Sequence, residues 1–269
     1  MSAAPKPATH DHAHGPVPAV SARGTAPEAL RLEDLTLAYE RHPAVHHLSG
    51  SFVRGSLTAI VGPNGGGKST LLKAVMGLIR PAAGRIERFG LDPARIAYLP
   101  QAAELDRAVP VSVAELAMLG HWRRLGAFGA ASQEDRARAQ AALNAVGLAG
   151  FERRPIATLS AGQLRRALFA RLMLEESPLI LLDEPFASID QRAAEDLMGV
   201  IARWHGEGRT VVAVLHELDR VRRHFPATLL LARHKVAWGP TADVLAEVNL
   251  TRARALTAAW DEAAEVCAA

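Results

Sequence analysis

A glycine-rich segment, residues 62–70, constrains the fold more than any other part of the chain. It follows the apolar run 57–61 and precedes the apolar run 71–76, which predicts a strand, a tight turn and a helix in direct succession. The segment has the pattern G-x-x-x-x-G-K-[ST] of a phosphate-binding P-loop. Its residues are Gly62, Pro63, Asn64, Gly65, Gly66, Gly67, Lys68, Ser69 and Thr70. A glycine-rich turn without a ligand is the alternative, and the flanking strand and helix favour the phosphate site.

The chemistry of this segment suits ATP with Mg²⁺. Backbone N–H groups at the start of a helix point toward one spot and attract anions, and glycines let the backbone come close to phosphate. Lys68 is placed to reach the β and γ phosphate oxygens, and the Ser69 hydroxyl to bind Mg²⁺. The sequence therefore predicts a nucleotide site at the end of the strand 57–61.

The bulk composition limits the remaining choices. The 269 residues, 49% of them hydrophobic, are enough for one large domain or two closely packed ones. The net charge of +3 comes from scattered arginines without a run of like charges, so we expect no nucleic-acid partner. A single cysteine, Cys267, excludes an internal disulfide and fits a reducing cytosol. No apolar stretch reaches the roughly 18 residues of a membrane span, so any membrane role is expected to come through a partner.

The amino-terminal segment, residues 1–29, is rich in Ala, Pro and His and is expected to be disordered. His10, His12 and His14 alternate along it, with Asp11 between two of them. Imidazoles spaced in this way can converge on zinc in a weak, open site. A solvated tail that binds no metal is the alternative, and both readings stay open.

The rest of the chain alternates apolar strands with helices, which predicts an α/β fold. Strands are expected at 30–38, 48–53, 57–61, 85–89, 96–100, 178–184, 210–215, 227–232 and 235–238. Helical stretches at 112–120, 132–147 and 161–176 predict an inserted helical subdomain at about 102–176. The stretch 42–47 is expected to be a surface loop. A helical tail is expected at 241–269, which leaves 30–240 as the main domain.

Polar side chains follow several of these strands. Asp183 and Glu184 end the apolar run 179–182, Gln101 follows the strand 96–100, and His216 follows the strand 210–215. The carboxyl ends of parallel strands meet at the edge of a sheet where ligands bind. Asp183, Ser69 and Gln101 are therefore candidate Mg²⁺ ligands, Glu184 a candidate base for an attacking water, and His216 a candidate contact to the γ-phosphate.

A second candidate phosphate site lies at Ser160, Ala161, Gly162 and Gln163. Ser160 is a suitable helix cap, and the N–H groups after it favour an anion. A second phosphate site on one chain makes sense if two copies dock head to tail, so that each ATP is held between the P-loop of one copy and the Ser160 segment of the other.

These motifs, in this order, resemble the ATP-binding subunits of ABC transporters over about 30–240. The resemblance implies a P-loop NTPase with a RecA-like α/β core, an antiparallel β subdomain and an inserted α-helical subdomain. It assigns three motifs to ranges of the chain: Walker A to 62–70, the signature to 159–163 and Walker B to 179–184, with Glu184 as the catalytic carboxylate. It assigns four single residues: Tyr39 stacks on adenine, Gln101 is the glutamine of the Q-loop, Asp190 is the aspartate of the D-loop, and His216 is the switch histidine. Ala161, Gly66 and Glu217 depart from the usual pattern, and Ala161 is expected to weaken the signature without abolishing its function.

Within that family, the run 166–171 and the form Asp183-Glu184-Pro185-Phe186 resemble the zinc and manganese importer ATPases of bacteria. This resemblance implies an ATPase homodimer at the cytoplasmic face of the inner membrane, bound to permease subunits and served by a periplasmic metal-binding protein. Zinc is the first expectation and manganese the second. An importer of iron chelates is the alternative cargo, and a soluble ABC ATPase acting on DNA or ribosomes is the competing class. A P-loop kinase or GTPase would leave Ser160 and His216 unexplained.

Overall fold

The computed structural model describes residues 27–39, 42–101, 107–126 and 129–258. The histidines at 10, 12 and 14 lie outside the described residues, so their metal-binding reading stays a hypothesis. No helix among the described residues is long and apolar enough to cross a membrane.

A six-stranded sheet forms the centre of the protein, with the strand order β5-β6-β7-β3-β8-β9. All neighbours are parallel except β8 and β9. The strands are β3 (Leu57–Val61), β5 (Ile96–Leu99), β6 (Leu179–Asp183), β7 (Thr210–Val214), β8 (Ala227–Ala232) and β9 (His234–Pro240). Every residue of β3, β6 and β7 is buried, because both faces of these strands are covered. Burial on both faces explains why the sequences of these three strands are largely continuous apolar runs.

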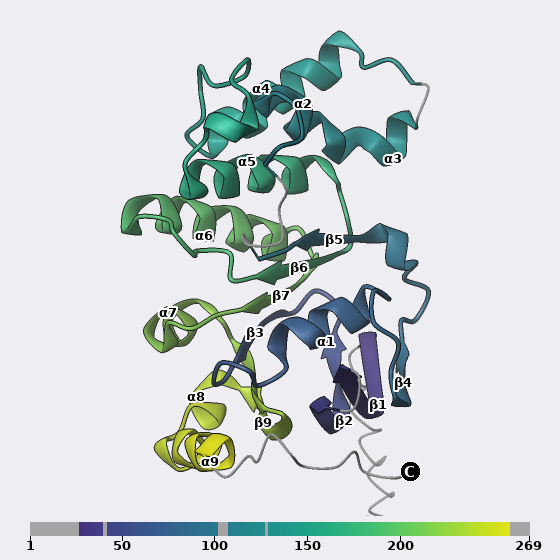
Figure 1. The fold of residues 1–269 in the computed structure, drawn as a ribbon, viewed down its shortest axis with the longest axis vertical. Coiled ribbons are helices and arrows are strands. Elements are labelled where there is room, and N and C mark those ends of the chain that lie inside the picture. Colours follow the sequence, from purple (N-terminus) through teal and green to yellow (C-terminus); the bar gives the residue numbers. More distant parts are fainter. Residues whose placement is uncertain (1–26, 40–41, 102–106, 127–128, 259–269) are drawn as a thin grey trace, which may run out of the picture.

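A smaller antiparallel sheet with the order β2-β1-β4 lies beside the central one (Figure 1). Its strands are β1 (Glu28–Tyr39), β2 (His42–Val53) and β4 (Ala83–Glu87). Strand β1 is longer than the strand expected at 30–38, by two residues at its start and one at its end. The expected surface loop at 42–47 was wrong, since these residues belong to β2. His46 is only 5% exposed there, with its ring stacked at 5.0 Å on that of His234 in β9, a contact between distant segments that local sequence cannot reveal.

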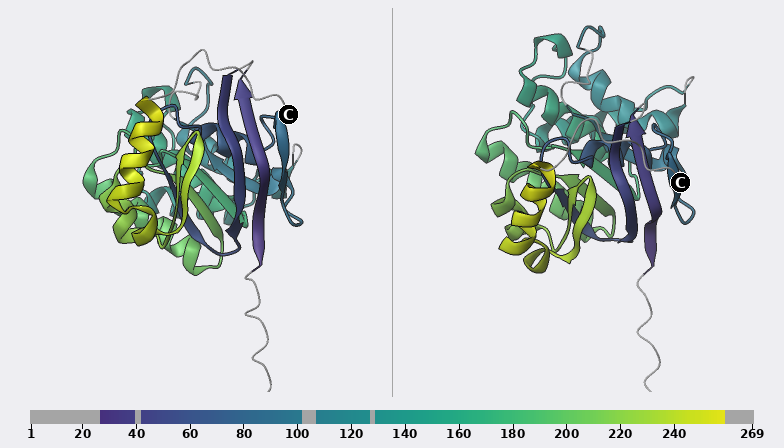
Figure 2. Two further views of the ribbon diagram at one scale, coloured as in Figure 1. Left: turned by 90° about the horizontal axis from the view of Figure 1, so that it is seen from below. Right: turned by 60° about the horizontal axis from the view of Figure 1, so that its bottom comes forward.

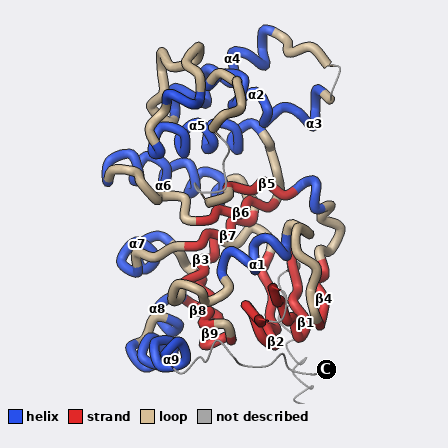
Figure 3. Tube along the Cα trace, viewed as in Figure 1, coloured by secondary structure: helices blue, strands red, loops and turns tan. Residues whose placement is uncertain are grey.

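Helices cover both faces of the central sheet, and four of them gather at one end of the molecule (Figure 1, Figure 3). The α-helices of the described residues are α1 (Lys68–Val75), α2 (Val113–Met118), α3 (Trp122–Leu125), α4 (Gln133–Ala145), α5 (Ala161–Leu174), α6 (Gln191–Gly206), α7 (Leu218–His224), α8 (Thr241–Val244) and α9 (Glu247–Ala258). Helices α2 to α5 form the gathered end, where three of the four match the helical stretches expected from the sequence. The short helix α3 was not expected.

Alternate residues of each central strand enter different cores. Ala59 and Val61 of β3 pack with the core that contains α5 and α6, whereas Ile60 packs with Leu71 of α1 and Leu32 of β1. Helix α1 therefore lies between the two sheets, while α9 and β9 lie on the other side of β8 from β3 (Figure 2). This arrangement fixes the end of β3, and with it the start of α1, from both sides.

The carboxylate of Asp135 is buried at the start of α4. It accepts hydrogen bonds from the backbone N–H of Ser132 at 2.9 Å and from the Ser132 hydroxyl at 2.8 Å, and the Arg124 guanidinium contacts its other oxygen. The bonds from Ser132, followed by the Arg124 contact, lower the pKa of Asp135 from 3.8 to about 2. Ionised Asp135 is thus a stabilising group of the helical end.

We expect an Asp135→Asn variant to melt at a lower temperature than wild type at neutral pH. The depressed pKa means that the contribution of Asp135 is complete above about pH 4 and is lost as the pH falls toward about 2. The difference between variant and wild type should therefore shrink over that window. Thermal unfolding at a series of pH values measures it, with Asp219→Asn as the control because the Asp219 side chain is 90% exposed. A difference that stays constant down to pH 2 would contradict the ionic role.

Candidate nucleotide-binding and hydrolysis site

The glycine-rich turn between β3 and α1 can be built only with glycine at two of its positions. Gly62 has a φ of 147°, and a Cβ atom there would lie 1.9 Å from the carbonyl oxygen of Leu231. Gly67 caps α1 with a φ of 86°, and a Cβ atom there would lie 2.2 Å from the carbonyl oxygen of Ala44. The turn is therefore wedged between β8 and β2, which holds its backbone in one shape.

A pocket of about 490 Å³ opens beside this turn. Residues 64–70 form one wall, and Ala44, Gln101 and Glu184 complete the lining. Backbone of a glycine-rich turn and the first turn of a helix on one side, with polar side chains opposite, suits a chain of phosphates. The residues present therefore fit the triphosphate of ATP.

Lys68 lies at the first position of α1, with 6% of its surface exposed. Its ammonium donates hydrogen bonds to the carbonyl oxygens of Gly62 at 3.0 Å and Pro63 at 2.8 Å. Burial lowers the pKa of the Lys68 ammonium, and the carboxylates of Glu184 and Asp183 act in the opposite direction. The side chain is thus a cation held against the turn by backbone oxygens, on the wall of the pocket.

Four neighbouring strands deliver the polar groups to one edge of the sheet. In spatial order, β5 leads to Gln101, β6 to Glu184, β7 to His216 and β3 to the P-loop. Glu184 Oε1 accepts a hydrogen bond from Gln101 Nε2 at 2.7 Å and lies 2.8 Å from His216 Nε2. The structure therefore brings together three side chains that are far apart in the sequence, around a single carboxylate oxygen.

The backbone at Glu184 has a φ of 49°, in the left-handed region that non-glycine residues seldom adopt. Asp183, one residue earlier and completely buried, is the last residue of β6. Its Oδ1 accepts a hydrogen bond from the Ser69 hydroxyl at 3.1 Å. A hydroxyl and a carboxylate in contact provide the oxygen ligands that Mg²⁺ prefers, so these two residues fit that ion.

The second candidate phosphate segment lies elsewhere in this chain, since no residue of 160–163 lines the pocket of the P-loop. Ser160 caps α5 in a reciprocal arrangement, in which Gln163 N–H donates to Ser160 Oγ at 3.1 Å and Ser160 N–H to Gln163 Oε1 at 2.9 Å. A Cβ atom on Gly162 would lie 2.7 Å from the carbonyl oxygen of Ser188. Asp190, just beyond Ser188, caps α6 through the N–H of Ala193. The signature segment and the D-loop thus touch each other but leave the P-loop pocket open.

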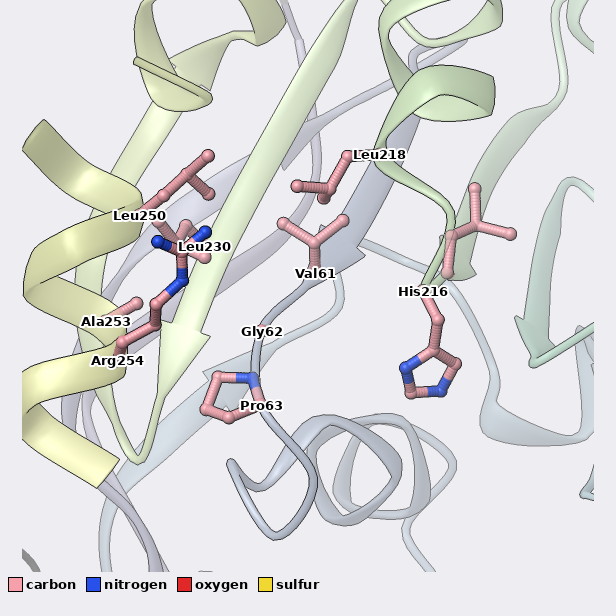
Figure 4. A pocket seen from close by; sticks show the side chains of 10 residues that line it. Val61, Gly62, Pro63, His216, Leu218, Leu230, Leu250, Ala253 and Arg254 are labelled. Atoms are coloured by element: carbon pink, nitrogen blue, oxygen red, sulfur yellow. The ribbon is translucent and has the colours of Figure 1, made fainter. Parts of the chain in front are cut away.

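Tyr39 ends β1, where its backbone pairs with His42, but its side chain lies outside the described part of the chain. Its adenine-stacking role therefore stays a prediction. A second, mainly apolar pocket of about 220 Å³ lies behind the start of the P-loop. Leu250, Ala253 and Arg254 of α9 face Val61 and Pro63 across it, while His216 lies on the other side of Val61 (Figure 4). Helix α9 therefore lies behind the P-loop, with this pocket between them.

Comparison with known protein families decides the class. A family model described as ABC transporter matches residues 45–187, a span that holds the P-loop, Gln101, Ser160 and Glu184. The chain belongs to the ABC transporter family. It is an ATP-binding subunit of that family and an ATPase, as the sequence predicted.

Relatives of this ABC subunit align over most of both chains. The manganese transport system ATP-binding protein MntB of Bacillus subtilis is 35% identical over 227 residues, covering 83% of this chain and 91% of that protein. The zinc transport system ATP-binding protein TroB of Treponema pallidum is 34% identical over 229 residues, covering 84% of this chain and 86% of that protein. The family resemblance drawn from the motifs is confirmed.

Solved structures agree with this assignment. An inward-facing ABC transporter assigned to the metal-chelate type matches with a TM-score of 0.73 and 28% identity, covering 85% of this chain and 89% of that one. The ATP-binding cassette MJ0796, dimeric after hydrolysis and bound to ADP and Pi, matches with a TM-score of 0.69 over 79% of this chain and 98% of that one. At 24% identity the second likeness concerns the fold alone. The expected P-loop NTPase fold is confirmed.

Two residues of the site were absent from the sequence-based prediction. Ala44 contributes to the pocket from β2, and nothing in its sequence context marks it. Arg165 is 1% exposed and donates to the carbonyl oxygens of Pro100 and Asp183, at the base of the Gln101–Glu184 pair. A signal for Arg165 did exist, because it lies three, four and seven residues before the buried Leu168, Phe169 and Leu172 of α5.

Proposed function

We propose that this ABC subunit powers the import of a divalent transition-metal ion, zinc or manganese, by hydrolysing ATP at Glu184. The similarity to MntB and TroB over more than four fifths of the chain carries the choice of cargo. The convergence of Gln101 and His216 on one oxygen of Glu184 carries the assignment of the hydrolytic centre. An importer of iron chelates stays the alternative, and a likeness to a transporter of the metal-chelate type is compatible with it.

In the proposed reaction, the P-loop N–H groups and Lys68 hold the phosphates of ATP. Glu184 orients a water molecule and accepts its proton while the water oxygen bonds to the γ-phosphorus. The bond from that phosphorus to the bridging oxygen breaks, and ADP leaves with the electron pair. His216 donates a hydrogen bond to a γ-phosphate oxygen, and Gln101 steadies the water or the metal. Ser69, Gln101 and Asp183 would hold Mg²⁺, which would supply positive charge next to the phosphates.

A second copy of the chain is proposed to complete the site. Ser160 to Gln163 lie away from the P-loop pocket of their own chain, and their exposed helix start suits a phosphate. Two copies arranged head to tail would each place this segment, with Asp190 nearby, over the ATP of the other. ATP binding would then close the dimer, and hydrolysis would open it.

The remaining partners follow from the transport role. The end of the molecule that holds α2 to α4 exposes apolar side chains at Val109, Leu119 and Trp122, which are 45%, 46% and 56% exposed. We propose that this inserted helical subdomain, with Gln101 and the segment up to about residue 130, receives a cytoplasmic helix of a permease subunit. The ATPase would thereby sit at the cytoplasmic face of the bacterial inner membrane, in a system that includes a periplasmic metal-binding protein.

Metal accumulation in a strain that lacks this chain tests the cargo. We expect uptake of zinc or manganese at low external concentration to fall to the level of a permease deletion, and to return when the wild-type chain is supplied. A Glu184→Gln chain should not restore it.

Normal uptake of both ions together with lost uptake of an iron chelate would overturn the cargo in favour of the alternative. Failure to co-purify with any membrane protein would support a soluble ABC ATPase instead. A chain without residues 1–26 tests whether the histidine segment contributes.

A further inference from the structure

Arg165 is a buried cation next to the hydrolytic centre, and its contacts give it a role beyond packing. It lies in the first turns of α5, directly after the signature segment, and its side chain is among the largest that are fully buried in the described structure. Burial lowers the pKa of its guanidinium, while the nearby carboxylates of Glu184 and Asp183 counteract this shift. Keeping a charge in such a place is costly, so its contacts call for an explanation.

A single nitrogen of Arg165 connects two strand ends. Nη1 donates to the carbonyl oxygen of Pro100 at 2.9 Å and to that of Asp183 at 3.2 Å. Pro100 directly precedes Gln101, and Asp183 directly precedes Glu184. The side chains of Gln101 and Glu184 are in turn joined by their 2.7 Å hydrogen bond. These contacts close a ring that runs from Arg165 through one strand end, across the Gln101–Glu184 bond, and back through the other.

We propose that Arg165 is a positioning residue for ATP hydrolysis, which sets the separation of Gln101 and Glu184 by fixing the backbone immediately before each of them. Neither Gln101 nor Glu184 lies within a strand of the sheet. Gln101 follows the end of β5, and Glu184 sits in a left-handed backbone conformation just past β6. Because one guanidinium binds the carbonyl oxygens of both Pro100 and Asp183, it restrains the backbone at both points where the chain leaves the sheet. Displacement of a reacting group by about 1 Å can cost as much as 100-fold in rate.

The same contacts would connect the hydrolytic centre to the dimer interface. Helix α5 begins at Ala161, and Ser160 caps it. When the signature segment of one copy meets the nucleotide of the other, any shift of this helix end reaches the Pro100 and Asp183 carbonyls through Arg165. Arg165 would then make the Gln101–Glu184 geometry depend on whether the second copy is docked. This step rests on the role of Glu184 and on the dimer proposed above.

Arg171 offers a matched control on the same helix and the same strand. Its Nη2 donates to the carbonyl oxygen of Tyr98 in β5 at 2.8 Å, so it also ties α5 to β5 through an arginine and a backbone oxygen. It lies six residues further along α5, and within the described part of the chain its side chain pairs with Glu175 and forms no hydrogen bond to Asp183 or Glu184. Replacing either arginine by methionine removes the charge and the donors but keeps an unbranched apolar stem.

The test compares Arg165→Met and Arg171→Met in the full-length chain, by steady-state ATP hydrolysis, ATP titration and thermal unfolding. We expect Arg165→Met to lower kcat by about 10-fold or more with the Kd for ATP within about 2-fold of wild type. Arg171→Met should keep kcat within about 2-fold, whatever its effect on stability. An Arg165→Met variant with wild-type kcat, or an equal loss of kcat in both variants, would overturn the positioning role.

Two further variants keep the outcome decisive. If Arg165→Met fails to bind ATP, Arg165→Lys takes its place, because lysine keeps a cation but its side chain is one atom shorter, so its ammonium would fall short of the position of Nη1 between the Pro100 and Asp183 carbonyl oxygens. A wild-type kcat in Arg165→Lys overturns the proposal, and a lowered kcat with intact ATP binding supports it. Adding Arg165→Met to Glu184→Gln should cause no further loss of kcat, because Arg165 acts through Glu184. If Glu184→Gln alone keeps wild-type turnover, the proposed hydrolytic centre fails, whatever Arg165 does.

Discussion

A Glu184→Gln variant is expected to hydrolyse ATP at least about 100-fold more slowly than wild type, with its affinity for ATP unchanged. Glu184 Oε1 accepts from Gln101 and lies within hydrogen-bond distance of His216. The amide oxygen of glutamine can accept the same two bonds, so the three side chains stay assembled. What the substitution removes is the carboxylate that takes the proton from water. Phosphate release under saturating ATP, alongside an ATP titration, measures the two effects separately.

Glu217→Gln provides the matched control for this variant. Glu217 follows His216 at the same edge of the sheet, but its side chain is 63% exposed and its carboxylate pairs with Arg220 at 2.8 Å. The same change of charge there should leave kcat within about 2-fold of wild type. Turnover near the wild-type rate in Glu184→Gln would remove Glu184 from the role of base.

The Glu184→Gln variant also tests the two-copy site. When hydrolysis is blocked, ATP should accumulate between the copies and hold them together, so the variant should elute as a dimer with ATP and as a monomer without nucleotide. A Ser160→Arg change in the same background should prevent the dimer, because a bulky side chain would occupy the place proposed for the phosphates of the other copy. A monomer in the presence of saturating ATP would contradict the head-to-tail arrangement.

The polar edge of the sheet was predictable because its strands are buried on both faces. The runs 57–61, 179–183 and 210–214 carry no alternation, and this marked them as parallel strands whose ends bind ligands. Asp183, Glu184 and His216 could then be placed by counting from the strand ends. The local capping of α5 was predictable for a similar reason, since Ser160 followed three residues later by Gln163 is a helix-start pattern.

Other features depend on contacts between distant segments and were out of reach. His46 became a buried strand residue because β9 covers it through His234, which no pattern near residue 46 indicates. Ala44 reaches the pocket because β2 runs along the glycine turn, where its carbonyl leaves no room for a side chain at Gly67. In the sequence Arg165 looks like a surface arginine, unless its position around helix α5 is compared with that of the buried Phe169, four residues later. For His46 and Ala44 the missing information was which distant segment lies beside the residue, whereas for Arg165 the helix phase was available in the sequence.

A Lys68→Ala variant is expected to bind ATP about 10- to 100-fold more weakly than wild type. Hydrogen bonds to charged groups contribute roughly 1.5–3 kcal/mol each, and each 1.4 kcal/mol is about tenfold in affinity. Because Lys68 is placed to reach the β and γ oxygens, the loss should be large for ATP and ADP and small for adenosine. Equilibrium titration with the three ligands measures this difference, which a general loss of folding would not produce.

The free protein complicates this variant in one respect, because Lys68 donates to the carbonyl oxygens of Gly62 and Pro63 and so also holds the turn itself. Thermal unfolding without nucleotide reports that contribution separately from the phosphate contact. Lys73→Ala removes the same charge from the last turn of the same helix and should leave ATP affinity within about 2-fold of wild type. An ATP affinity equal to that of wild type in Lys68→Ala would show that the turn binds phosphate through its backbone alone.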